Sequence, residues 1–149
     1  MEKEAEKLFL NYKRKYIRHF GRKSIDNFQI EEFCQKEFKN WRGCYAQDEK
    51  FKIKNGCYII NTDVKAGKGE HWCGMYVCSK TAYVFDSFAR DPKKLLSYLT
   101  KNLRGKQIKV VSSDRSDTEQ RGLSEVCGPL CIAWLSVVRD IGIRKAVRI

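Results

Sequence analysis

The chain has 149 residues, of which 42% are apolar and 12% aromatic, which predicts one folded domain with a core of ordinary size and excludes a disordered chain. Its 30 Lys and Arg residues against 18 Asp and Glu give a net charge of +12, which favours polyanionic partners such as nucleic acid without identifying an activity. No apolar run approaches the ~20 residues of a membrane span, and the N-terminus is charged rather than signal-like, so we expect a soluble, unsecreted protein without a membrane partner.

The first predicted element is an amphipathic helix over residues 2–20. Apolar residues recur every three or four positions from Ala5 to Phe20, and Gly21 ends the pattern. Six basic residues in and after its second half form a candidate nucleic-acid surface: Lys13, Arg14, Lys15, Arg18, Arg22 and Lys23. The alternative is a solvated helix face whose aromatic residues dock on the core.

A second helix is predicted over residues 27–38, with Ser24 or Asp26 as its cap. Residues 41–48 are expected to form a loop that leads toward the sheet. The Asn55-Gly56 turn then precedes an apolar run over residues 57–61, which is typical of a buried strand.

A hairpin is predicted next, with strands over 71–78 and 81–87 around a two-residue turn, Ser79-Lys80. In that register Asp86 faces Cys73, and His71 lies one diagonal step away on the same side of the sheet, roughly 7–8 Å at Cα. A carboxylate at this position would orient the imidazole and stabilise its protonated form. A three-residue or bulged turn would put His71 and Asp86 on opposite faces of the sheet. The simpler interpretation is a core hairpin with a histidine at its rim.

After the hairpin, one helix is predicted from Asp91, its cap, to Gly105, and a strand over 107–112. A polar segment over 113–126 is long for a loop in a small domain, which is typical of functional or mobile loops. The last helix begins near Cys127. We expect a single domain with a basic N-terminal helix (1–23), a core (24–142) and a basic tail (143–149).

The seven cysteines are odd in number and irregularly spaced. The close pairs Cys73/Cys78 and Cys127/Cys131 do not fit a zinc pattern with matching histidines, so we expect reduced thiols in an intracellular compartment and no metal.

Cys127 stands where a helix begins, and the unpaired N–H groups and helix dipole at that position favour a thiolate. With His71 as base and Asp86 behind it, this is a Cys-His-Asp nucleophilic set. Gln120 could direct its amide at a developing oxyanion, with the Cys127 N–H as second donor. Cys131, one turn further along, is expected to be a core thiol. A papain-like order, with the cysteine far upstream of the histidine, is disfavoured.

Four ordered motifs resemble the adenain/SUMO-protease clan of cysteine peptidases over roughly residues 25–138: His-Trp at 71–72, Tyr-Val-Phe-Asp-Ser-Phe at 83–88, Gln120, and Cys-Gly-Pro-Leu-Cys at 127–131. The segment 56–61 and the glycines before His71 resemble viral members of the adenovirus-protease type, found also in virophages and large DNA viruses. The resemblance implies an α+β fold, in which helices flank a central mixed β-sheet and the nucleophilic cysteine begins a buried helix.

The resemblance also implies the chemistry. His71 would be the general base, Asp86 its orienting partner, Cys127 the nucleophile and Gln120 an oxyanion donor, while Trp72 and Gly128 would bind substrate. The expected reaction is cleavage of viral capsid or core precursors at small, Gly-containing sites, by a monomer acting in the virion, the infected-cell cytoplasm or a viral factory. No cofactor is required, and DNA is a candidate activator.

Two alternatives stay open. The first is a protease that removes SUMO or another ubiquitin-like modifier, although the chain is short for one. The second is a basic nucleic-acid-binding module on a protease-like fold. The peptide-activating disulfide of adenovirus members does not carry over, because no cysteine lies between Cys78 and Cys127.

Overall fold

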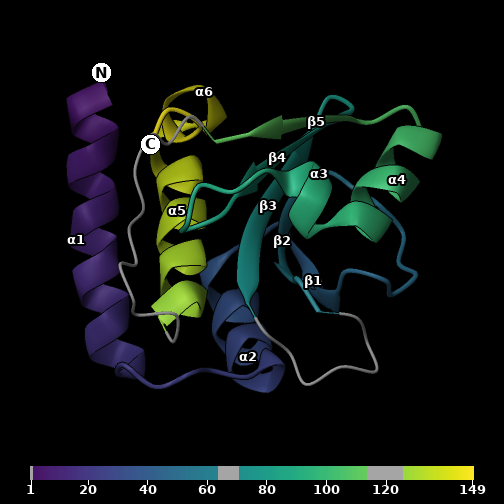
Figure 1. Ribbon diagram of the computed structural model, residues 1–149. Coiled ribbons are helices and arrows are strands. Elements are labelled where there is room, and N and C mark those ends of the chain that lie inside the picture. Colours follow the sequence, from purple (N-terminus) through teal and green to yellow (C-terminus); the bar gives the residue numbers. More distant parts are fainter. Residues whose placement is uncertain (1, 64–70, 114–125) are drawn as a thin grey trace.

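The computed structural model describes residues 2–63, 71–113 and 126–149 (Figure 1). It is an α+β protein built on one five-stranded mixed sheet, in the order β1-β2-β3-β4-β5. The two outer pairs, β1/β2 and β4/β5, are parallel, and the two inner pairs are antiparallel. The strands are β1 (Trp41–Ala46), β2 (Gly56–Asn61), β3 (Trp72–Cys78), β4 (Thr81–Phe85) and β5 (Lys109–Ser112). This confirms the predicted α+β class with a central mixed sheet flanked by helices.

The helices cover both faces of the sheet. They are α1 (Glu2–Phe20), α2 (Asn27–Glu37), α3 (Pro92–Leu95), α4 (Ser97–Gly105), α5 (Cys127–Ile141) and α6 (Ile143–Ala146). Figure 1 shows α5 between the sheet and α1, with α3 and α4 on the opposite side. One apolar cluster joins α1, α2 and α5 to the first face, and a second joins α4 to the other face.

The N-terminal helix packs as its pattern predicts. Ala5, Phe9 and Tyr16 are buried, and the Phe9 ring lies 5.7 Å from the Phe85 ring at the end of β4. The buried Tyr16 hydroxyl lies 2.9 Å from the Ser136 hydroxyl on α5. Helix α1 therefore supports both the central helix and the strand that leads to Asp86.

Helix α2 is capped by Asp26, whose side chain accepts the Gln29 N–H at 2.9 Å while the Gln29 side chain accepts the Asp26 N–H at 3.0 Å. This reciprocal pair is a capping box. Of the two predicted caps, Asp26 is therefore the one that the helix uses.

The loop predicted over residues 41–48 is wrong, because residues 41–46 form the edge strand β1. β1 pairs in parallel with β2 through a bulge between Trp41 and Gly43. The Glu31 carboxylate of α2 accepts the Cys44 N–H at 2.5 Å and the Trp41 indole N–H at 3.3 Å. Contacts with residues distant in the sequence define this strand. Its own sequence has no regular alternation of apolar residues, so the pattern did not predict it.

The hairpin has the predicted register, with Cys78 opposite Thr81 and Gly74 opposite Phe85. Ser79 and Lys80 both have positive φ, +49° and +58°. Positive φ at both central residues is the type I′ geometry, whose twist matches a two-residue hairpin. The turn therefore sets the side of the sheet on which each later residue of β4 lies.

The single helix predicted from Asp91 to Gly105 is two helices, α3 and α4, which break at Leu96. Asp91 caps α3 as expected. At the break the Gln47 side chain donates to the Leu95 carbonyl at 3.1 Å and accepts the Tyr98 N–H at 3.2 Å. An amide from a distant loop thus replaces helical hydrogen bonds.

Helix α5 is buried at every position from Cys127 to Val138, as expected for a helix that is apolar all round. The predicted tail over 143–149 contains α6, and Ala146 and Ile149 are buried. The Trp134 indole donates to the Ala146 carbonyl at 3.0 Å. This segment is therefore part of the core around α5, although Arg144, Lys145 and Arg148 are exposed.

No helix in the described residues combines the length and the apolar character needed to cross a membrane.

Candidate active site

Three elements that are separate in sequence place three candidate residues together. His71 immediately precedes β3, Asp86 immediately follows β4, and Cys127 is the first residue of α5. The hairpin register brings the first two side by side, and the packing of α5 on β3 adds the third. All three side chains belong to buried residues.

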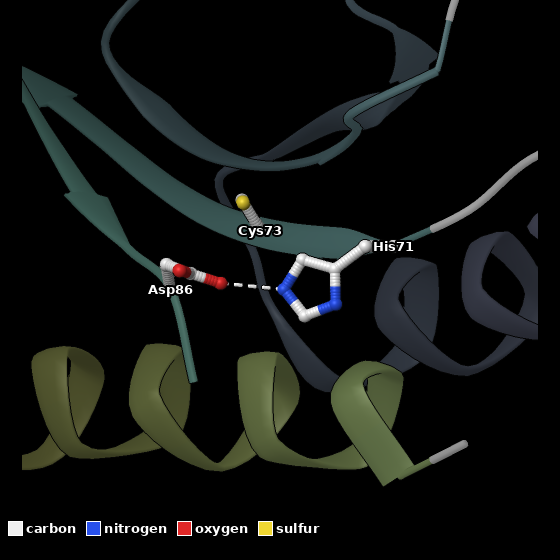
Figure 2. A group of neighbouring side chains, drawn as sticks. All are labelled: His71, Cys73 and Asp86. Atoms are coloured by element: carbon white, nitrogen blue, oxygen red, sulfur yellow. Dashed lines mark hydrogen bonds and ion pairs between the residues drawn. The ribbon is translucent and has the colours of Figure 1, made fainter. Parts of the chain in front are cut away.

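The imidazole of His71 and the carboxylate of Asp86 are directly hydrogen-bonded. Nε2 of His71 lies 2.5 Å from Oδ1 of Asp86 (Figure 2). The residues are only 6% and 3% exposed, so water screens the pair poorly. In Figure 2 the second ring nitrogen points away from Asp86, toward the first turn of α5. The predicted His-Asp pair is therefore present in this geometry.

Burial and hydrogen bonding compete in setting the pKa of His71. Burial lowers the pKa, but hydrogen bonds with the side chains of Asp86, Cys127 and Cys73 outweigh it, and the pKa is raised above its usual 6.5. Burial alone would raise the pKa of Asp86. Hydrogen bonds with His71 and Arg90 outweigh burial and lower the pKa to about 2. The site therefore favours an imidazolium beside a carboxylate.

The Cys127 sulfur accepts the backbone N–H of Trp72, the residue after His71, at 3.4 Å. Its side chain is close enough to the imidazole to contribute to the raised pKa of His71. Val126, which precedes the helix, makes no side-chain capping bond among the described residues. The sulfur therefore lies at the open first turn of α5, beside the residue that follows His71. Gln120 lies outside the described residues.

Trp72 and Gly128, the predicted substrate-binding residues, lie next to each other on the α5 side of the sheet. The half-buried Trp72 donates its indole N–H to the Ile25 carbonyl at 3.1 Å. A Cβ built on Gly128 would lie 2.7 Å from the Ile25 side chain and 3.6 Å from the Trp72 ring. Any larger residue at position 128 would crowd Ile25. The role of Trp72 and Gly128 in substrate binding stays a prediction.

Two further thiols lie near the site. Cys131 is fully buried and its sulfur donates to the Trp72 carbonyl at 3.2 Å, which agrees with the expected core role. Cys73 is also fully buried, and burial raises its pKa. All seven cysteines lie in described residues and are free thiols.

One group of side chains has metal-ligand chemistry. One atom each of His71, Cys73 and Asp86 lie within 4.8 Å of one another. His71 and Asp86 are already hydrogen-bonded to each other, so a metal held by this group would have to replace that bond. The expectation of no metal stays a prediction.

Sequence reasoning missed Arg90, which makes three hydrogen bonds to Asp86. It also missed Phe88, whose ring lies 5.4 Å from the His71 ring. The spacing of four between Asp86 and Arg90 is typical of ion pairs within a helix. The sequence does not predict a helix here, and a non-helical turn brings the two side chains together.

The six candidate nucleic-acid residues lie on or just after the second half of α1. Five are exposed, and Lys13 is half-buried. The Lys15 ammonium lies 5.9 Å from the Tyr12 ring centre and 5.8 Å from that of Tyr16. The surface is basic and accessible, and its binding role stays a prediction. His19, expected to be structural, packs against Phe20 and Phe33.

Comparison with known proteins adds no family to this geometry. No protein-family model matches the chain, and no curated protein matches it at a significant level. A functional assignment therefore depends on the site itself and on the resemblance of its motifs.

Proposed function

We propose that the chain is a cysteine endopeptidase with a fold of the adenain/SUMO-protease type. The observation that carries the proposal is the arrangement of three buried residues. His71 bonds to Asp86 at 2.5 Å, and Cys127, at the start of α5, holds its sulfur against the backbone N–H of Trp72, the residue after His71. A nucleophile, a base and a group that orients the base are the parts that nucleophilic catalysis needs.

The proposed reaction begins with the Cys127 proton already on His71, in keeping with the raised pKa of this imidazole. The thiolate attacks the scissile carbonyl carbon, and the oxyanion accepts hydrogen bonds from the Cys127 N–H and the Gln120 amide. The imidazolium protonates the leaving amine as the C–N bond breaks, which leaves a thioester. Water, activated by His71, then attacks the thioester and releases the acid and the free thiol. Asp86 stays ionised throughout and stabilises the imidazolium.

The proposed substrates are viral capsid or core precursors, cut at small Gly-containing sites inside infected cells or the virion. The crowding of Trp72, Ile25 and Gly128 beside Cys127 supports a preference for small residues next to the scissile bond. A protease for ubiquitin-like modifiers is the second candidate. Cleavage of a folded modifier in preference to a short Gly-Gly peptide would favour it.

The first test is labelling with a peptide vinyl sulfone that ends in Gly-Gly, followed by mapping of the modified cysteine by mass spectrometry. Selective labelling of Cys127 is expected, because only this thiol adjoins both an imidazole and a helix start. His71→Ala should reduce the labelling rate by at least about 10²-fold, the lower end of what a general base contributes.

Cys78→Ser is the matched control, since Cys78 is a half-buried thiol on the same hairpin, away from His71. Its labelling pattern should equal that of the unmodified protein. Labelling spread over several cysteines, or an unchanged rate in His71→Ala, would overturn the proposed site. DNA binding that persists in Cys127→Ala, with no thiol reactivity in the unmodified protein, would favour the nucleic-acid-binding module instead.

A further inference from the structure

Both oxygens of the Asp86 carboxylate are held by Arg90. Oδ2 accepts the Arg90 backbone N–H at 2.9 Å and its Nε–H at 2.9 Å, and Oδ1 accepts Nη2–H at 3.3 Å. Oδ1 is also the oxygen that bonds to His71. The carboxylate thus has an imidazole on one edge and a guanidinium on the other.

The turn after β4 brings Arg90 back to Asp86. Ala89 has a positive φ of +56°, and its N–H donates to the Asp86 carbonyl at 2.9 Å. The guanidinium carbon lies 4.9 Å from the centre of the Phe88 ring, which in turn packs on the His71 ring. Arg90 is therefore fixed by backbone, ring stacking and ion pairing, although 44% of its side chain is exposed.

We propose that Arg90 is a positioning residue for the His71–Asp86 pair. Its fork of donors fixes the plane of the carboxylate, and its charge offsets part of the negative charge that Asp86 presents to His71. The inference rests on the proposed function, because it assigns Arg90 a part in the same site.

The electrostatic consequence depends on every charged or titratable group that faces the imidazole in the described part of the chain. These are Asp86 and Arg90 after β4, Cys73 on β3, and Cys127 on α5. Arg90 is the only fixed positive charge among them. Without it, the unneutralised Asp86 would hold the imidazolium proton of His71 more strongly. The reactive pH range of the Cys127–His71 pair should therefore move upward.

The test measures the rate of Cys127 alkylation by iodoacetamide against pH in the unmodified protein, Arg90→Gln and Arg90→Lys. In Arg90→Gln the midpoint of the acid limb should rise by about 0.5–1 pH unit, the effect expected of one charge removed near a partly exposed site. Arg90→Lys keeps the charge but not the fork, so its midpoint should stay close to that of the unmodified protein.

Peptide cleavage provides the second readout. Both variants should lose kcat by about 10-fold or more with KM unchanged, because the carboxylate loses its fixed plane while substrate contacts remain. Arg104→Gln, an exposed arginine on α4, is the control and should change neither the midpoint nor kcat.

The two proposals fail in different ways. If Cys127 of the unmodified protein alkylates no faster than a free cysteine at any pH, the proposed function fails. If Cys127 is reactive but Arg90→Gln has the same midpoint, the assignment of Arg90 fails. If Arg90→Gln does not fold, Arg90→Lys decides: a lower kcat at constant KM supports the positioning role, and an unchanged kcat overturns it.

Discussion

The Asp86 carboxylate makes four side-chain hydrogen bonds, and these determine its charge. Its carboxylate is almost fully buried, yet four donors from His71 and Arg90 keep its pKa low. Hydrogen bonds to an ionised buried group are among the strongest in proteins. The pair should therefore contribute to folding as well as to chemistry.

Replacing Asp86 with Asn should lower the free energy of unfolding in a pH-dependent way. The folded pKa, about 2, lies below the usual 3.8, so the contribution is present above about pH 4 and is lost as the pH falls toward 2. The difference between the proteins should be on the order of 2 kcal/mol at pH 6. Urea unfolding from pH 2.5 to 7 measures it.

The raised pKa of His71 acts at the other end of the range. Its contribution is complete below pH 6.5 and is lost only as the pH rises through the higher folded value. No loss is therefore expected between pH 4 and 6.5. A stability difference between the unmodified protein and Asp86→Asn that stays constant down to pH 2.5 would contradict the ionised, hydrogen-bonded state of Asp86.

At the scale of elements, the start of α5 is fitted against the segment between α1 and α2. Gly128 leaves no room for a Cβ beside Ile25, which is itself only 4% exposed and cannot retreat into solvent. The fit fixes the axial position of α5, and with it the position of Cys127 relative to β3.

Gly128→Ala should therefore lower the free energy of unfolding by about 1–3 kcal/mol, the usual range for an overpacked site. Gly105→Ala is the control, because Gly105 is also a helical glycine, the last residue of α4, but has open space around it. That change should raise stability by about 0.5–1 kcal/mol through helix propensity. Thermal unfolding of both variants measures the contrast.

Removing both Cγ1 and Cδ1 of Ile25, which would each lie 2.7 Å from the added Cβ, should relieve the contact. In Gly128→Ala with Ile25→Ala, the combined loss should be smaller than the sum of the single losses, which a double-mutant cycle detects. Strict additivity would show that the crowding at Ile25 is not the cause.

Local chemistry explains which elements were predictable. The His71–Asp86 contact follows from the hairpin because a two-residue turn fixes every facing pair in both strands. The capping box at Asp26 and the cap at Asp91 are likewise local. β1 and the break at Leu96 were missed because residues distant in sequence, Glu31 and Gln47, supply the hydrogen bonds that define them.

The candidate site divides in the same way. His71, Asp86 and Cys127 were recognisable because nucleophilic catalysis uses these residue types and each stands at the end of an element. Arg90 was missed because its contact depends on the positive φ of Ala89, which propensity does not predict for alanine. The sequence alone therefore predicts the three residues that the structure brings together, but not the residue that holds Asp86.

On the scale of the whole molecule, the charge of +12 predicts salt-dependent binding of DNA, through the second half of α1. Changing Arg14, Arg18 and Arg22 to Glu should weaken binding of a labelled duplex and flatten its dependence on salt, by roughly 0.9 in logarithmic slope for each phosphate that the protein no longer neutralises. Fluorescence anisotropy between 50 and 300 mM salt measures both.

An equal change of charge at the C-terminal end of α4 and the residue after it is the control: Lys101, Arg104 and Lys106 to Glu. If the two triple variants bind equally, the affinity reflects net charge and α1 is not a specific surface. Activity that stays constant as DNA is added at low salt would remove DNA as an activator, whatever the affinity.

The burial of α5 has a consequence for the order of folding. All five strands precede this helix in the sequence, and the helix fills the core on one face of the sheet. During synthesis the His71–Asp86 hairpin can form early from local contacts, but the thiol that completes the site arrives only with the helix that closes the core. Formation of the core and assembly of the site are therefore one late event, of high contact order, so partly folded chains should be unreactive toward the vinyl sulfone.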